Sequence, residues 1–344
     1  MPASQLPSLC LIGTSNGVFE TGYSSVFQNS NKISSFSKNC LGFCSSSLFS
    51  LMAPRLNFKE FDICVFDFAP NDGVQIKKNF VRPEVVKATV ADAIQCVLDA
   101  GCLPSLFILP ALSVFQSNVW EVQEIYLDLA DKYNLPVLDG YAYLRSQQQK
   151  GIDIPSLFAD DMHLKLPVAA ELAEYFLDGI LAVSQERMPA RQVSGTGYRQ
   201  FFCPVTSLRP DGYDLISRKT ALFQTELLEL EQSCKITVPA KAGDEIIAIG
   251  VDWANSRGKL TLSSATESNI ALTTMYAGDD PKRFIFGLHP VEPVRLAGEE
   301  IGLLLADDSK GPAKLALAGL TIRRKNDFSV TTLLSQLTVL PCSG

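Results

Sequence analysis

Short apolar runs alternate with amphipathic stretches through the first half of the chain, and this alternation limits the possible folds most strongly. The apolar runs are Ser8–Ile12, Lys32–Phe36, Phe61–Phe68, Ser105–Leu109 and Leu135–Leu138. The helical patterns are Phe19–Gln28, Glu84–Ala100, Ser117–Tyr133 and Val168–Gln185. Strands that alternate with helices are typical of a parallel sheet with crossover helices on both faces. The first half is therefore predicted to be a three-layer α/β/α domain.

The pattern changes after Arg187. The following segments are β-branched or aromatic and are separated by Gly, Asp, Asn and Pro: Cys234–Val238, Glu245–Val251, Lys259–Ser263, Asn269–Met275, Arg283–Leu288 and Ile301–Ala306. Such segments predict an all-β sandwich-like domain. Met188–Gly197 is a plausible linker, so we expect an α/β domain over residues 1–190 and an appended β domain over 198–344.

Composition excludes several classes of partner and group. A net charge of −7 without a Lys/Arg run argues against nucleic acid. With nine cysteines, no C-x-x-C pair and two histidines, we expect reduced thiols, no metal site and no cofactor. The N-terminus lacks a signal-peptide pattern, and no apolar stretch reaches the roughly 18 residues of a membrane span, so a cytoplasmic location is expected.

Ser15 is the first candidate for chemistry. It lies in a tight Gly13–Gly17 turn, directly after the first strand and before the first helix. In an open parallel sheet this is the carboxyl edge, where ligands bind. The alternative interpretation is that Ser15 only caps the following helix. A serine needs a base before it can act as a nucleophile, so the hypothesis requires a histidine.

His163 is the better of the two available histidines. His289 lies in the β-rich half without an acidic residue shortly before it, and we interpret it as structural. His163 follows Asp160 by three positions, a spacing that lets the carboxylate orient the imidazole as a triad acid does. Asp161 is the second choice for this role, because adjacent side chains usually diverge.

Two further strand ends offer donors for an oxyanion. Gly42 follows the second strand, where a glycine lets its backbone N–H approach a ligand closely. Asn71 follows the third strand and carries a side-chain amide that can donate. Each is also compatible with an ordinary turn. Their occurrence at successive strand ends favours an oxyanion hole.

The ordered set of these motifs resembles the four sequence blocks of the SGNH/GDSL hydrolases, over roughly residues 8–185. The blocks correspond to Gly13-Thr14-Ser15, Gly42, Ala69-Pro70-Asn71-Asp72 and Asp160-Asp161-Met162-His163. The resemblance implies a flavodoxin-like sheet, with Ser15 as nucleophile and with Asp160 and His163 completing the triad. It also implies that the N–H groups of Ser15 and Gly42 and the amide of Asn71 form the oxyanion hole. Thr14, Ala69 and Leu164 depart from the common pattern, which indicates a divergent branch.

The resemblance implies a serine-dependent ester hydrolase, and an O-acetylated carbohydrate or another small ester is the expected substrate. Two alternatives remain: an O-acetyltransferase that uses the same triad, and a non-catalytic glycan-binding protein on a hydrolase scaffold. Trp253, Tyr276 and Phe286 in the β-rich half are interpreted as core residues rather than a sugar-stacking platform. Trp120, on a predicted helix, is likewise interpreted as packing.

Overall fold

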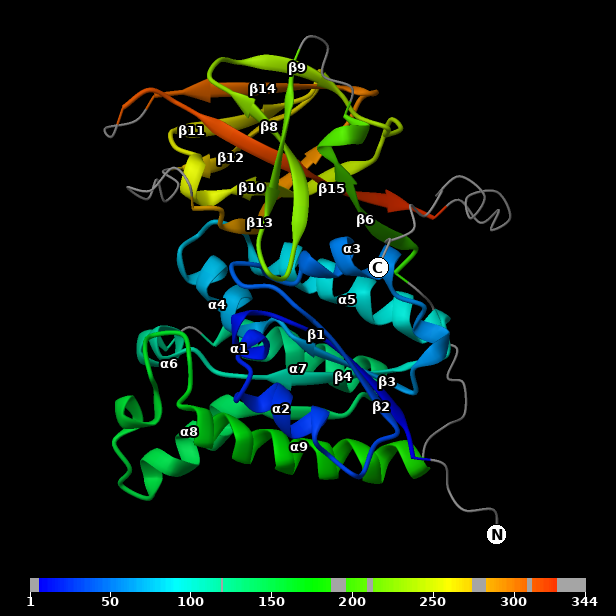
Figure 1. Ribbon diagram of the computed structural model, residues 1–344, viewed down its shortest axis with the longest axis vertical. Coiled ribbons are helices and arrows are strands. Elements are labelled where there is room, and N and C mark those ends of the chain that lie inside the picture. Colours follow the sequence, from blue (N-terminus) through cyan, green and yellow to red (C-terminus); the bar gives the residue numbers. More distant parts are fainter. Residues whose placement is uncertain are drawn as a thin grey trace.

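The protein consists of an α/β part followed by a β part, stacked along the long axis (Figure 1). A computed structural model describes residues 6–118, 120–186, 196–208, 213–273, 283–307 and 311–326. The predicted linker at 188–197 lies largely outside the described residues, so the exact domain boundary stays a prediction.

A five-stranded parallel sheet forms the centre of the α/β domain. Its strands are β1 (Ser8–Gly13), β2 (Ser35–Cys40), β3 (Ile63–Asp67), β4 (Leu103–Ile108) and β5 (Val137–Asp139), in the spatial order β2-β1-β3-β4-β5. Every residue of β3 is buried, as expected for a continuous apolar run in a covered parallel sheet. The order is the flavodoxin-like one, so the predicted fold class is confirmed.

Helices cover this sheet from both sides. They are α1 (Ser15–Val18), α2 (Tyr23–Gln28), α3 (Leu48–Met52), α4 (Ala69–Lys77), α5 (Pro83–Asp99), α6 (Leu112–Ser117), α7 (Glu121–Tyr133), α8 (Gly140–Gln149) and α9 (Leu166–Glu186), with short 3-10 turns η1 (Ala53–Arg55), η2 (Phe58–Glu60) and η3 (Ile154–Leu157). Helix α2 packs on α9, whereas α7 contacts α4 and α5. Figure 1 shows α9 and α5 on opposite sides of the strands.

Two predicted helices differ from the structure. The helix expected over Ser117–Tyr133 begins only at Glu121, because the preceding α6 ends at Ser117 and Asn118 adopts a left-handed backbone conformation with φ of 53°. The helix expected from Phe19 begins only at Tyr23, after a turn closed by the N–H of Gly22 on the carbonyl of Phe19.

The second domain contains two antiparallel sheets. One has the order β13-β10-β15-β8-β7 with β6 also paired to β15, and the other has the order β12-β11-β14-β9. The strands are β6 (Tyr198–Pro204), β7 (Leu215–Lys219), β8 (Gln224–Leu230), β9 (Cys234–Thr237), β10 (Glu245–Asp252), β11 (Lys259–Ser263), β12 (Ser268–Thr273), β13 (Phe286–Arg295), β14 (Glu300–Ala306) and β15 (Leu315–Lys325), with a 3-10 turn η5 (Trp253–Asn255) and η4 (Val205–Ser207). Ile246 of the first sheet shares a buried core with Leu260 and Leu303 of the second. This packing confirms the predicted sandwich-like domain.

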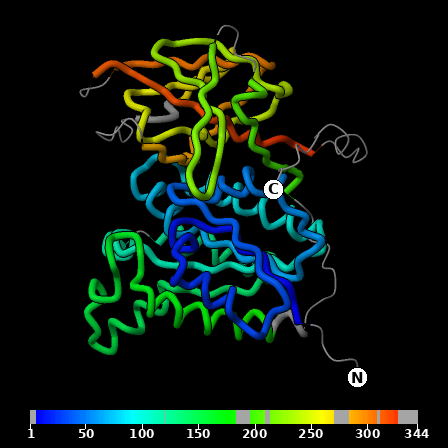
Figure 2. Tube along the Cα trace, viewed as in Figure 1, coloured from blue at the N-terminus to red at the C-terminus, as the bar shows by residue number. Residues whose placement is uncertain are grey.

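Buried contacts join the two domains. The hairpin β7–β8 reaches down to the α/β domain (Figure 2), and Phe223 at its turn is buried in the hydrophobic cluster of that domain. Arg323 on β15 pairs with the fully buried carboxylate of Asp92 on α5, with Nε and Oδ2 2.6 Å apart. The Oγ of Ser50 lies 2.8 Å from the Oγ1 of Thr321. The β domain is therefore packed firmly on the α/β domain.

Candidate active site

Ser15 opens α1 at the carboxyl edge of the parallel sheet. The strand β1 ends at Gly13, and the N–H of Thr14 then donates to the carbonyl of Asp67, the last residue of β3. A Cβ on Gly17 would lie 2.5 Å from the Sγ of Cys40 and 2.8 Å from the hydroxyl of Tyr23, so only glycine fits there. This crowding holds the turn against the sheet, with Ser15 partly exposed.

The side chains of Ser15, His163 and Asp160 form a continuous hydrogen-bonded chain. The Oγ of Ser15 lies 2.8 Å from the Nε2 of His163. The Nδ1 of the same ring lies 2.8 Å from each oxygen of Asp160. An imidazole held in this way accepts a proton at Nε2 while the carboxylate stabilises the resulting cation. Of the two acids considered, Asp160 makes this contact, and Asp161 is exposed.

A short hairpin fixes the loop that carries Asp160 and His163. Phe158 and Leu164 pair as an antiparallel bridge, and the N–H of Ala159 donates to the carbonyl of His163. Within the loop, one oxygen of Asp160 also accepts the N–H of His163 at 2.9 Å. Partial desolvation raises the pKa of Asp160, but these hydrogen bonds outweigh it, so the net pKa lies below the ordinary value and the carboxylate stays ionised.

Gly42 faces Ser15 from the loop that follows β2. A Cβ built on Gly42 would have the Cβ of Ser15 as its neighbour, at 3.8 Å. The N–H of the preceding residue, Leu41, donates to the carbonyl of Gly13 and continues the pairing of β2 with β1. Gly42 is therefore adjacent to the predicted nucleophile.

Asn71 lies in the first turn of α4 and is tied to the same loop. Its Nδ2 donates to the carbonyl of Cys44, two residues beyond Gly42. The neighbouring Asp72 is buried and accepts the N–H and the hydroxyl of Ser46, at 2.9 and 3.1 Å. The Tyr126 hydroxyl donates to the other carboxylate oxygen at 2.7 Å. Asp72 thus anchors the loop that follows β2.

The β domain also holds this loop. Cys44 pairs with Leu288 of β13 as a parallel β-bridge, and both residues are buried. The loop that carries Gly42 is thus held both by Asn71 of α4 and by Leu288 of β13.

A second buried acid lies directly beneath the serine turn. Asp67 accepts the hydroxyl of Tyr23 at 2.6 Å, and its other carboxylate oxygen is buried with no hydrogen-bond partner among the residues that the structure describes. Burial raises the pKa of Asp67 to about 7, although the hydrogen bonds from Tyr23 and Thr14 oppose this rise. The burial of this carboxylate was not predicted from the sequence.

Exposed aromatic rings flank the site. Phe19 is 43% exposed and contacts the ring of His163 edge-on, with centroids 5.4 Å apart. Phe43, next to Gly42, is 61% exposed and has a φ of 57°. The reacting groups therefore lie at an open, partly apolar surface.

The remaining predicted residues lie away from Ser15. His289 is buried against the rings of Trp253 and Phe80, and desolvation lowers its pKa to about 3, so the ring stays neutral. Phe286 is buried and packs on Phe223, as expected of a core residue. Tyr276 lies outside the described residues.

Two further features concern membrane-spanning helices and the state of the cysteines. Among the described residues, no helix combines the length and the apolar character needed to cross a membrane. All eight cysteines within the described ranges have free thiols.

Comparison with known proteins gives matches at the level of structure. No protein-family model matches the sequence, and no curated protein matches it either. The structure is similar to that of CEX, a two-domain esterase active on acetylated mannans, with a TM-score of 0.63 and 14% identity over 93% of this chain and 92% of that one. The same esterase co-crystallised with mannopentaose gives the same TM-score.

Shorter proteins match about half of the chain. A G-D-S-L family lipolytic protein from Desulfitobacterium hafniense has a TM-score of 0.41 and 17% identity, over 49% of this chain and 97% of that one. An acetylxylan esterase from Geobacillus stearothermophilus has a TM-score of 0.44 and 14% identity, over 52% and 96%. Over nearly its whole length, the chain thus has the overall fold of the two-domain esterase CEX.

Proposed function

We propose that the protein is a serine esterase that removes acetyl groups from carbohydrate. The observation that carries the proposal is the contact of Ser15 Oγ with His163 Nε2 at 2.8 Å, while Asp160 holds the opposite ring nitrogen. The substrate class rests on the likeness to an esterase active on acetylated mannans over nearly the whole chain. Since the likeness to that esterase concerns only the fold, acetylated carbohydrate as the substrate is itself proposed.

In the proposed reaction, Ser15 Oγ attacks the carbonyl carbon of the ester while its proton passes to His163 Nε2. The negative charge on the carbonyl oxygen is stabilised by the N–H groups of Ser15 and Gly42 and by the amide of Asn71. The intermediate then collapses: the C–O bond to the sugar breaks, and His163 gives its proton to the departing hydroxyl.

Water completes the cycle. It attacks the acetyl-Ser15 ester while His163 takes its proton, and the second intermediate releases acetate and restores Ser15. Asp160 stays ionised throughout and stabilises the imidazolium, which fits its lowered pKa.

The first alternative, an O-acetyltransferase, differs only in what attacks acetyl-Ser15. Acetate release from an acetylated oligosaccharide should be measured with and without a second, unacetylated oligosaccharide. The hydrolase proposal predicts full acetate release without the acceptor. Loss of the donor's acetyl group only when the acceptor is present, with the acetyl group recovered on the acceptor and not as acetate, would establish the transferase instead.

The second alternative is a glycan-binding protein without catalysis. A short-chain nitrophenyl ester tests it, because release of nitrophenol needs no recognition of sugar. The proposal predicts turnover by the wild type that is lost in Ser15→Ala, whereas binding without turnover by either protein would favour the alternative.

A further inference from the structure

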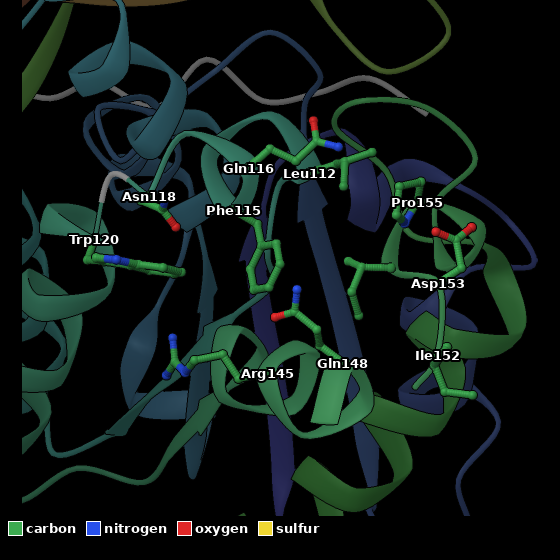
Figure 3. A pocket seen from close by; sticks show the side chains of 11 residues that line it. Leu112, Phe115, Gln116, Asn118, Trp120, Arg145, Gln148, Ile152, Asp153 and Pro155 are labelled. Carbon is green, nitrogen blue, oxygen red and sulfur yellow. The ribbon is translucent and has the colours of Figure 1, made fainter. Parts of the chain in front are cut away.

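A cavity of about 460 Å³ lies between α6, α8 and the η3 turn (Figure 3). Ser15 and His163 do not line it. The wall of the cavity is nevertheless linked to His163 through the chain, because Ile154 and Pro155 belong to the η3 turn that leads into the Asp160–His163 hairpin. On the other side, the N–H of Ser113 in α6 donates to the carbonyl of Asp161. The cavity and the predicted base therefore share one loop.

The lining combines an apolar floor with a polar rim. Leu112, Phe115 and Ile154 are buried and form the floor. Gln116 and Gln148 are exposed lining residues on two different helices, and Figure 3 shows the Gln148 carboxamide beside the ring of Phe115 and the Gln116 side chain next to Leu112. A carboxamide offers both a donor and an acceptor, which a sugar hydroxyl requires, while the C–H face of a sugar ring packs on apolar side chains.

The charge of the lining favours a neutral ligand. Arg145 is in the wall, but its guanidinium carbon lies 5.2 Å from the ring centre of Trp120 and its Nη1 donates to Gln123 Oε1 at 3.0 Å. Its Nη2 is also 3.6 Å from a carboxylate oxygen of Asp139. Asp153 adds a negative charge to the rim. A bound phosphate or carboxylate would thus find the charge of Arg145 already compensated and would be repelled by Asp153.

We propose that this cavity is a subsite for a neutral sugar, which holds an unreacting unit of the glycan whose acetyl ester Ser15 attacks. Its volume falls within the range of about 300–1,000 Å³ that small-molecule sites occupy. The inference rests on the proposed function for the identity of the reaction, but the binding itself does not depend on Ser15. It also extends the interpretation of Trp120, which packs on Phe115 and also lines the cavity.

The subsite contributes through binding energy remote from the reacting bond. Contacts with a distant sugar unit raise kcat/KM for a glycan and leave a small ester unaffected, because the small ester never reaches them. The cavity is therefore a determinant of substrate length.

The kinetic test uses Gln116→Ala/Gln148→Ala, with Gln149→Ala as the matched control. Gln149 is an exposed glutamine at the end of α8, the helix that carries Gln148, and it does not line the cavity. Two lost hydrogen bonds should lower kcat/KM for an acetylated manno-oligosaccharide about tenfold. Nitrophenyl acetate should be hydrolysed at the wild-type rate. An equal loss on both substrates, or no loss on the oligosaccharide, would overturn the proposal.

The binding test uses the Ser15→Ala protein, titrated with mannopentaose and with xylopentaose by calorimetry. We expect saturable binding of at least one of them, and loss of that binding when Gln116→Ala/Gln148→Ala is added. Failure of both sugars to bind, or binding that survives the added changes, rejects the subsite. If the sugar binds here but wild-type protein hydrolyses no ester, the proposed function fails and the subsite stands.

Tryptophan fluorescence emission provides a second measurement of sugar binding in the same titration. The chain has two tryptophans, Trp120 and Trp253, and only Trp120 lines the cavity. The sugar should change the emission of the Ser15→Ala protein, and Trp120→Phe should remove that change. An emission change that persists in Trp120→Phe would contradict binding at this cavity.

Discussion

Cys44 and Leu288 connect the two domains at the candidate oxyanion loop, because their backbones pair as a β-bridge. The carbonyl of Cys44 also accepts the amide of Asn71. The loop that brings Gly42 to Ser15 is therefore positioned partly by the β domain. We therefore expect the second domain to influence the proposed reaction, although the proposed catalytic residues all lie in the first domain.

Leu288→Ala tests this connection. Truncation of a buried leucine costs about 2–5 kcal/mol, and here the space left behind lies directly against the loop. We expect a lower kcat on nitrophenyl acetate together with a lower melting temperature. Leu303→Ala is the control, since Leu303 is equally buried within the β domain core. If the two variants lose stability alike and both keep the wild-type kcat, the connection has no functional role.

The ion pair of Asp92 and Arg323 should stabilise the domain interface. Arg323→Met leaves the buried carboxylate of Asp92 without its partner, which costs about 3–5 kcal/mol. Urea unfolding would measure the loss. Asp92→Leu/Arg323→Met should recover most of it, and a double variant as unstable as the single one would contradict this explanation.

Asp67 makes stability depend on pH. Its pKa in the folded protein is raised to about 7, so the folded state binds a proton that the unfolded state has already lost, and stability falls as pH rises toward and through 7. Asp67→Asn removes this dependence. Between pH 5 and 8 the unfolding free energy of the variant relative to wild type should rise by about 2–3 kcal/mol. A constant difference across this range would show that Asp67 titrates normally.

The oxyanion donors should affect rate more than folding. Asn71→Ala should lower kcat about 10²- to 10³-fold, the usual effect of losing one such donor. Gly42→Ala places a methyl group 3.8 Å from the Cβ of Ser15, a distance without a clash, so it should fold normally and react more slowly. Steady-state kinetics and thermal unfolding of both variants test this. Unchanged kcat in Asn71→Ala would remove its amide from the mechanism, whereas Gly42→Ala keeps its N–H and tests only the space beside Ser15.

The sequence predicted the parallel sheet well because its strands are long apolar runs such as that of β3. It misplaced β2, which was expected over Lys32–Phe36 and spans Ser35–Cys40, since most residues of this edge strand are not buried and follow no apolar pattern. The central strand β15 escaped prediction. Its LALAGLTI run is buried throughout, and a continuous apolar run fits a strand or a helix equally well.

For the site, spacing along the chain was informative only where the contact is local. Asp160 and His163 lie three residues apart, and their contact was predictable. The loop anchors Asp72 and Leu288 were not, because the partners Ser46 and Cys44 are distant in sequence and meet only in the folded chain. The cavity beside Trp120 likewise depends on three elements that no local pattern relates.

The most direct measurement is acetate release from an acetylated manno-oligosaccharide by the wild type, Ser15→Ala and His163→Ala. The Oγ of Ser15 lies 2.8 Å from Nε2 of His163, so the two residues should act together in the same proton transfer. Each variant should then lose about 10⁴-fold or more in kcat, and the double variant little further. Wild-type rates in Ser15→Ala would contradict the account.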